Sequence, residues 1–143
     1  MSGRVVAFDL GDRRIGVAVS DPTRTIAQGR ETILRDGATW PWRKILAVIE
    51  ETAATQVVVG DPLHFDGSTS ERSRTAGEFA QELRMRSGLP VDLEDERCTS
   101  VEAERMLAKT GRGRRRRDRG DVDRAAAILI LQDWLDARDG EAT

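Results

Sequence analysis

The fold is decided by residues 4–20, RVVAFDLGDRRIGVAVS, in which two short apolar runs flank a polar turn. The run from Val5 to Phe8 is unbroken, which is typical of a strand buried on both faces. A second run, Ile15 to Val19, follows the turn signal Gly11-Asp12. Because a parallel crossover needs about a dozen residues or more, these strands are expected to pair as an antiparallel hairpin. A pure Rossmann order is therefore disfavoured.

Downstream of this hairpin, helical and strand-like patterns alternate along the chain. The expected strands are residues 27–34, 57–59 and 91–93, and the expected helices are residues 42–54, 68–88, 99–111 and 122–137. An antiparallel start followed by alternating helices and strands predicts an α/β fold with a mixed five-stranded sheet, its first three strands antiparallel, flanked by helices. Residues 1–143 are expected to form a single domain, with 138–143 as a frayed tail.

Composition limits the classes of function. The chain has 143 residues with 23 Lys plus Arg against 25 Asp plus Glu, a formal net charge of -2, so any contact with nucleic acid must be local. A single Cys and a single His exclude an intramolecular disulfide and a histidine-rich metal site. The N-terminal residues show neither a signal peptide nor a membrane span, and we expect a cytoplasmic protein without membrane contact.

A local concentration of positive charge lies at residues 111–120, GRGRRRRDRG, which hold six Arg, three Gly and one Asp. This composition cannot be buried and predicts a mobile loop. Arginine side chains in such a loop can contact several phosphates of a nucleic acid and release counterions. The alternative is a solvated, flexible segment without a ligand.

Three carboxylates are predicted to meet at one end of the sheet. Asp9 ends the first strand, Glu96 follows the strand 91–93, and Asp123 begins the last helix. Carboxylates held close together repel one another unless a cation compensates them. With oxygen ligands only, Mg²⁺ or Mn²⁺ is favoured, and such ions promote phosphoryl transfer. The alternatives are a turn-capping Asp9 and a helix N-cap at Asp123.

The segment Gly60 to Gly67 lies between a strand and a helix, where backbone amides can receive a phosphate. Its spacing is not that of a Walker A loop, and Asp61 and Asp66 would repel an anion. A purely structural turn is an equal interpretation. His64 in this loop is expected to be a polar surface residue rather than a general base.

A series of short motifs runs from Val5 to about Asp136. They are Asp9-Leu10-Gly11, Arg14-Ile15-Gly16, Gly60-Asp61-Pro62 with Asp66-Gly67, Asp95-Glu96-Arg97, and Asp123 followed by Ala125-Ala126-Ala127 and Ile130-Leu131-Gln132. In this order and spacing they resemble the YqgF/RuvX family. The resemblance implies a fold similar to ribonuclease H and to Holliday-junction resolvases, and a metal-dependent nuclease that processes the 5' end of precursor 16S ribosomal RNA.

Carried over by motif, the resemblance places the catalytic and metal-binding carboxylates at Asp9, Glu96 and Asp123, with Asp95 and Asp121 as second choices. It places Arg14 and Arg97 beside them as phosphate or carboxylate partners. The predicted nucleic-acid contacts are completed by Arg114, Arg115, Arg116 and Arg117. Asp61 departs from the family pattern, which often has an apolar residue there, so the resemblance leaves its role open.

The sequence is compatible with three functions. The first is a metal-dependent endo- or exonuclease acting on structured RNA, or alternatively on branched DNA as a Holliday junction resolvase, and working as a monomer or homodimer. The second is a nucleic-acid-binding module that uses the arginine loop without cutting. The third is an actin-like or sugar-kinase ATPase, but such enzymes close two lobes on a nucleotide and this chain is long enough for one.

Overall fold

The structure is a computed structural model that describes residues 3–37, 39–62, 71–95 and 119–141; residues 119–123 and 139–141 are described by their backbone. The described elements are β1 (Arg4–Leu10), β2 (Arg14–Ser20), β3 (Ala27–Leu34), α1 (Trp42–Thr52), β4 (Ala54–Asp61), α2 (Glu71–Ser87), β5 (Val91–Asp95) and α4 (Arg119–Glu141). The expected helix 99–111 and residues 111–118 of the basic segment lie outside the described residues, whereas Arg119 and Gly120, which were expected in the loop, begin α4. The single domain over 1–143 stays a prediction.

The five strands form one mixed sheet in the order β3-β2-β1-β4-β5. Strand β1 pairs antiparallel with β2, which pairs antiparallel with β3. On its other side β1 pairs parallel with β4, and β4 pairs parallel with β5. The predicted mixed α/β sheet with an antiparallel first half is confirmed, and β1 lies at its centre.

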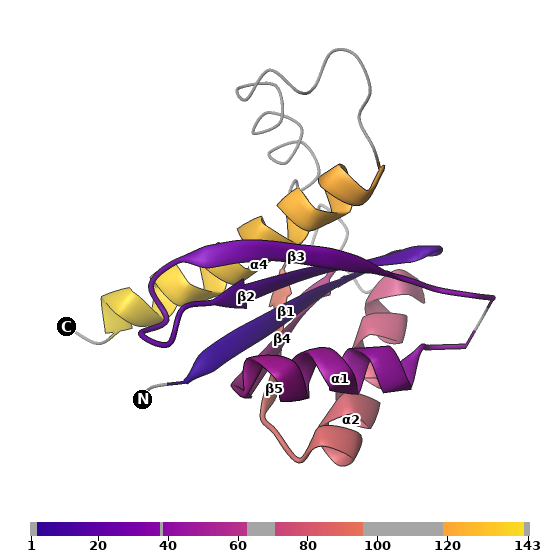
Figure 1. The fold of residues 1–143 in the computed structure, drawn as a ribbon, viewed down its shortest axis with the longest axis horizontal. Helices are drawn as coiled ribbons and strands as arrows, with labels where there is room; N and C mark the ends of the chain where they lie inside the picture. The colour runs from indigo at the N-terminus through magenta and orange to yellow at the C-terminus, as the bar shows by residue number, and fades with distance from the viewer. Residues whose placement is uncertain (1–2, 38, 63–70, 96–118, 142–143) are drawn as a thin grey trace, which may run out of the picture.

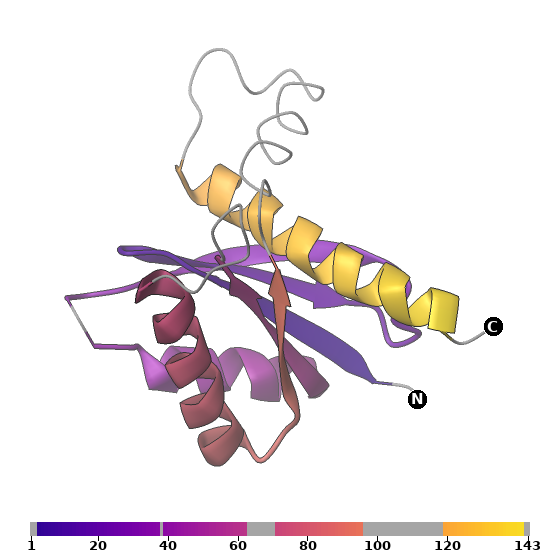
Figure 2. The same ribbon diagram turned by 180° about the vertical axis from the view of Figure 1, so that it is seen from behind.

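Helices cover both faces of this sheet (Figures 1 and 2). Helices α1 and α2 lie against one face and α4 lies against the other. Side chains of a strand alternate between faces, so Val6 and Phe8 join the core beneath α1 and α2, whereas Val5 and Ala7 join the core beneath α4. The unbroken apolar run of β1 is thus explained by burial from both sides.

Four aromatic side chains form a cluster on the α1 and α2 face. The ring of Trp42 stacks on Phe79 with centroids 5.0 Å apart, and Trp40 meets the same ring edge-on at 4.8 Å. Phe8 of β1 contacts Phe79 from the sheet at 6.4 Å. These contacts bury Phe79 completely and join both helices to the central strand.

Two helix boundaries differ from the sequence prediction. Helix α1 ends at Thr52 because Ala53 takes a left-handed conformation with φ 54°, and β4 already begins at Ala54. The predicted continuation of the helix to residue 54 was wrong. Helix α4 runs from Arg119 to Glu141, beyond both ends of the predicted 122–137.

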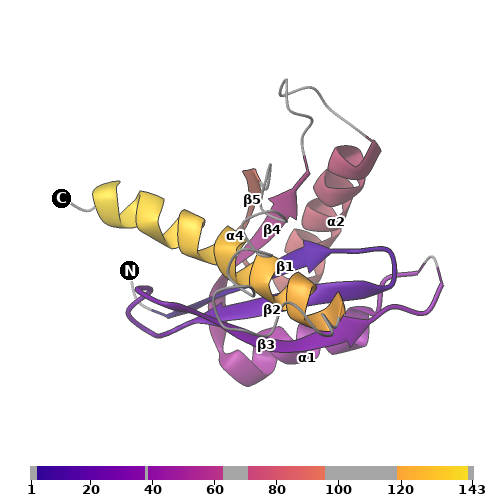
Figure 3. The ribbon, with the colours of Figure 1, turned by 90° about the horizontal axis from the view of Figure 1, so that it is seen from above.

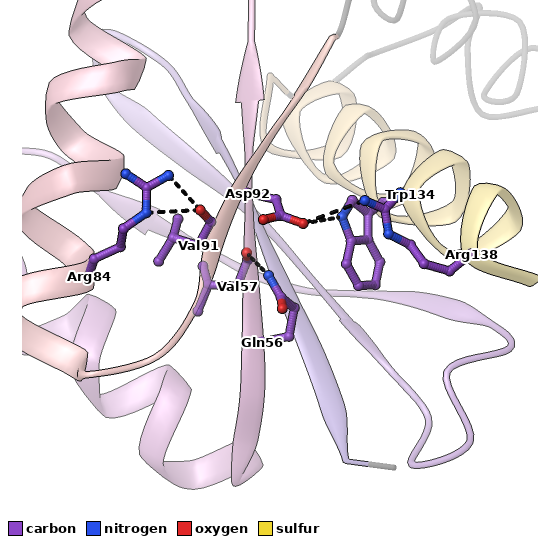
Figure 4. Close-up of polar contacts among 7 residues, drawn as sticks. All are labelled: Gln56, Val57, Arg84, Val91, Asp92, Trp134 and Arg138. Atoms are coloured by element: carbon purple, nitrogen blue, oxygen red, sulfur yellow. Dashed lines mark hydrogen bonds and ion pairs between the residues drawn. The ribbon is translucent and has the colours of Figure 1, made fainter. Parts of the chain in front are cut away.

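The C-terminal part of α4 is held against β5 by polar contacts, shown in Figure 4. The indole Nε1 of Trp134 donates a hydrogen bond to Asp92 Oδ2 over 3.0 Å. Arg138 lies over the Trp134 ring and pairs with Asp92 at 3.5 Å. These contacts hold the helix at residue 138 against the sheet, and α4 continues to Glu141. Fraying of residues 138–143 stays a prediction.

Replacing Asp92 by Ala is expected to lower the free energy of unfolding by about 1–3 kcal/mol, because the buried Trp134 indole loses its acceptor. Asp92→Asn keeps an acceptor oxygen and loses only the exposed ion pair with Arg138, worth about 1 kcal/mol or less. Urea unfolding of both variants measures the difference. An equal loss in the two would show that the indole contact does not hold α4.

Among the described residues, no helix has the length and apolar composition needed to cross a membrane.

Candidate active site

The candidate site lies at one edge of the sheet, where the three parallel strands end. Strand β1 ends at Leu10, β4 at Asp61 and β5 at Asp95. Because β1, β4 and β5 run in the same direction, their carboxyl ends share this edge. In open α/β sheets ligands bind outside the carboxyl ends of the strands. Asp9 therefore stands where the sequence predicted it, at the end of the central strand.

Asp9 is half-buried and lies on the face of the sheet that α4 covers. Val5 and Ala7 of the same strand pack into the core beneath α4, and Asp9 continues their alternation. Its neighbour across β2 is Gly16, which has no side chain. The β2 partner therefore places no side chain next to Asp9 on this face.

Helix α4 begins near the same edge. It lies across β1, β2 and β3 (Figure 3). Gln132 bonds the start of β3, at Thr25 and Ala27, whereas Arg124 donates from Nε to the Arg30 carbonyl, further along that strand, over 3.1 Å. Since β3 and β1 run in the same direction, the N-terminal turns of α4 lie toward the end of β1 that carries Asp9.

The backbone of Asp123 immediately precedes Arg124, so it belongs to these turns. Because the helix begins at Arg119, Asp123 lies inside α4, and the alternative of a helix N-cap was wrong. The side chains of Asp123 and Asp121 and the whole of Glu96 lie outside the described residues. The structure thus brings Asp9 and the Asp123 backbone to one end of the sheet, and the meeting of all three carboxylates stays a prediction.

Two further acidic residues end their strands on the opposite face from Asp9. Asp61 accepts a hydrogen bond from the Ser73 hydroxyl of α2 over 2.5 Å, which ties β4 to that helix. Asp95 lies on the same face of β5 as Val91, which packs in the core beneath α1 and α2. Asp61, whose role the sequence left open, therefore has a structural contact, and the second choice Asp95 is on the other side of the sheet from Asp9.

Sequence reasoning missed Glu94, which lies on the same face as Asp9. It pairs in register with Gly60 of β4, and its strand neighbour Asp92 contacts α4 on that face. Burial raises the pKa of Glu94; the guanidinium of Arg138 lowers it, whereas the carboxylates of Asp133, Asp95 and Asp92 raise it further. The sequence signal for this position was the spacing of Asp92 and Glu94, which places both acidic residues on the face of the strand opposite to the apolar Val91.

Replacing Glu94 by Gln is expected to raise the melting temperature at pH 7. The raised pKa means that ionisation of Glu94 costs more in the folded than in the unfolded chain, so stability falls as pH rises from the unfolded value of 4.5 through the folded one. The gain should vanish below about pH 4, where the carboxyl is neutral in both states. Melting curves across pH test this, with Glu78→Gln, an exposed position on α2, as the control. A gain independent of pH would contradict it.

The turn after Asp9 is fixed by backbone and arginine contacts. Gly11 donates its amide hydrogen to the Arg14 carbonyl over 2.9 Å, and a Cβ at Gly11 would lie 2.5 Å from that oxygen, so only glycine fits. Arg35 reaches from the end of β3 to the Gly11 carbonyl, with Nη1 at 2.6 Å, and lies over the Trp40 ring at 3.7 Å. Asp12 pairs with Arg72 of α2 at 3.1 Å.

A small cleft of about 90 Å³ opens beside this turn on the α2 side. Its lining includes Gly11, Arg35, Trp40, Gly60 and Arg72. The remainder of the loop 60–67, with His64, lies outside the described residues, as do Arg97 and the arginines at 114–117. The described arginines around the turn that follows Asp9 include Arg13 and Arg14 on β2 and its turn, Arg35 after β3, and Arg72 on α2.

The described residues alone contain no group of three or more His, Cys, Asp or Glu side chains that would hold a metal ion. A metal site at Asp9 therefore needs ligands from the rest of the chain, and Glu96 and Asp123 are those that the sequence predicts. The donor set would consist of carboxylate oxygens, which suit hard divalent cations.

Comparison with known proteins identifies the family. The pattern of the family described as "RuvX: Holliday junction resolvase" matches residues 3–137. The chain belongs to the RuvX family. Among curated RuvX relatives, a Koribacter versatilis protein is 43% identical, and the match covers 95% of this chain and 88% of the relative. A Roseiflexus protein is 40% identical, and the match covers 95% of this chain and 96% of the relative. Both carry the name "Putative pre-16S rRNA nuclease". The resemblance noted in the motifs is confirmed.

Solved structures show which fold this RuvX chain shares. RuvC of T. thermophilus in complex with a Holliday junction substrate aligns over 96% of both chains with a TM-score of 0.57 at 16% identity. The yeast mitochondrial Holliday junction resolvase Ydc2 aligns over 93% of this chain and 78% of its own, with a TM-score of 0.53 at 12% identity. The fold is that of the RuvC-like resolvases, as the sequence predicted.

Proposed function

We propose that this RuvX chain is a metal-dependent nuclease that hydrolyses phosphodiester bonds in precursor 16S ribosomal RNA. The observation that carries the proposal is the position of Asp9, half-buried at the carboxyl end of the central strand and on the face covered by α4. Family membership and the names of the curated relatives support a nuclease acting on nucleic acid. The proposed site of action is the cytoplasm.

The proposed site consists of Asp9, Glu96 and Asp123 around Mg²⁺ or Mn²⁺. The ion, when bound, activates a water molecule and stabilises the leaving oxygen of the phosphodiester. Asp9 supplies a carboxylate from a rigid, doubly covered strand, so its position is fixed before substrate binds. Arg14 begins β2 and lies on the same face as Gly16, Ala18 and Asp9, since residues two apart in a strand share a face. On this face its guanidinium can hold a phosphate beside the carboxylate.

Ribosomal RNA is preferred over branched DNA as substrate because the curated relatives at 43% and 40% identity carry the RNA-processing name. The Holliday junction is the second candidate, supported by the family description and by the fold of RuvC. A junction resolvase cuts two strands and needs two active sites, which requires a dimer, whereas cutting RNA can be done by a monomer.

The test is a cleavage assay in which substrate and metal are varied independently. Purified protein is incubated with a 5'-extended 16S precursor RNA and with a four-way DNA junction, each with Mg²⁺, Mn²⁺ or a chelator. The proposal predicts cleavage of the RNA that requires the divalent ion. Cleavage of the DNA junction without cleavage of the RNA would show that branched DNA is the substrate. Binding without cleavage in the presence of either ion would show that the protein is a nucleic-acid-binding module and not a nuclease.

A further inference from the structure

A second basic surface lies beside the site, apart from the arginine-rich segment at 111–120. It is a groove of about 480 Å³ between the β1–β2 turn and the end of β3. Its lining consists of Asp12, Arg13, Arg14, Leu34, Arg35 and Gly37. We call these residues the β3-end groove. Three of the six are arginines, although the whole chain carries a net charge of -2.

Two of the groove arginines, Arg13 and Arg14, have no acidic partner within the part of the chain that the structure describes. The one acidic side chain in the described lining, Asp12, is paired with Arg72 at 3.1 Å. A polyanion entering the groove therefore meets the guanidinium groups of Arg13 and Arg14 beside a carboxylate that is already paired.

Arg14 of the groove lies on the same face of the sheet as Asp9. Arg14 pairs with Leu34 across β2 and β3, and it begins the strand whose Gly16 lies opposite Asp9. The third arginine is held in place, since Arg35 stacks on Trp40 and donates to the Gly11 carbonyl at 2.6 Å. A chain of phosphates that starts at Asp9 can thus pass Arg14 and reach the end of β3.

We propose that the β3-end groove binds the sugar-phosphate backbone of the substrate strand on one side of the bond that is cut. The occupant is a nucleic-acid strand recognised by phosphate charge, and the described lining offers no aromatic side chain on which a base could stack. The proposal rests on the proposed function, since it assumes that a nucleic acid reaches Asp9. Arg13 thereby gains a binding role that the sequence motifs did not give it, and so does Arg35, whose side chain is held in place beside it.

The experiment measures binding, so cleavage does not enter it. Affinity for a labelled single-stranded RNA, and for DNA of the same sequence, is measured in chelator from low to high salt. Each phosphate contact contributes about 0.7 to the slope of log K against log salt for a single strand. The double variant Arg13→Gln/Arg14→Gln is expected to reduce the slope by about 1.4 for both polymers. The control Arg43→Gln/Lys44→Gln removes the same charge from exposed positions of α1 and should leave the slope unchanged.

A variant that adds charge to the groove distinguishes a loss of binding from a loss of folding. Leu34 lines the groove and is 60% exposed, so Leu34→Lys is expected to fold and to increase the slope by about 0.7. Met85→Lys, at a 76% exposed position of α2, adds the same charge away from the groove and is expected to have no effect. If the parent binds RNA and the groove variants match their controls, the groove proposal is overturned while the nuclease proposal stands. If the parent binds neither polymer, the groove proposal is overturned, and the nuclease proposal is decided separately by the cleavage assay with metal.

Discussion

Asp9→Asn is expected to reduce cleavage by more than about a hundredfold while leaving the fold intact. Asparagine has nearly the same shape as aspartate but carries no charge, so it cannot compensate a divalent cation. Loss of a group that only orients a metal ligand costs about 10- to 100-fold, and loss of the ligand itself should cost more. Initial rates on the precursor RNA at saturating Mg²⁺ measure the effect, and a melting curve confirms the fold.

The matched control is Asp95→Asn, which removes the same charge at the same edge of the sheet but on the opposite face. We expect its rate to stay within about tenfold of the parent, because a residue behind the sheet contributes only through the local field. An Asp9→Asn protein that cleaves like the parent, or an Asp95→Asn protein that is equally impaired, would contradict the assignment of the catalytic face.

Gly29→Ala is the second change with a large expected effect. A Cβ at Gly29 would lie 2.4 Å from Cγ and 2.6 Å from Cδ of Arg124, and 3.1 Å from Cδ1 of Ile128. Arg124 must then move and give up its bond to the Arg30 carbonyl, or α4 must move away from β3. Overpacking of this kind costs about 1–3 kcal/mol of unfolding free energy. Because Asp123 directly precedes Arg124, we also expect cleavage to fall about tenfold or more, since small misplacements at a site are costly.

Gly77→Ala provides the control for Gly29→Ala. Gly77 lies within α2 and a Cβ there would meet nothing within 4 Å, so alanine should raise stability by about 0.5–1 kcal/mol and leave cleavage unchanged. Adding Arg124→Ala to Gly29→Ala removes the clashing atoms and should recover part of the lost stability. A Gly29→Ala protein as stable and as active as the parent would show that the contact between α4 and β3 does not position the site.

The sheet was predictable from sequence because its signals are local. The apolar runs at Val5–Phe8 and Ile15–Val19, with a turn too short for a crossover, determine the antiparallel half. The boundary at Ala53 was not predictable, since its left-handed backbone interrupts an alanine pair that favours a helix on propensity alone. The extension of α4 to Glu141 depends on Asp92, which is distant in sequence from Arg138 and Trp134.

For the site, the position of Asp9 followed from the pattern of its own strand. What the sequence could not provide was the face of each carboxylate. Asp61, Glu94 and Asp95 are alike as acidic residues near strand ends, yet packing against α2 or α4 separates them. Arg35 was missed because its role depends on reaching Gly11 and Trp40 across the sheet edge.

Asp9, Glu96 and Asp123 are proposed to share a divalent cation. A crystal soaked in Mn²⁺ would reveal that cation through the anomalous signal of the metal. We predict a peak about 2.0–2.2 Å from a carboxylate oxygen of each of the three residues, as expected for manganese with oxygen ligands. A well-ordered crystal in which those oxygens lie on different sides of the molecule, or in which the metal binds away from Asp9, would contradict the account.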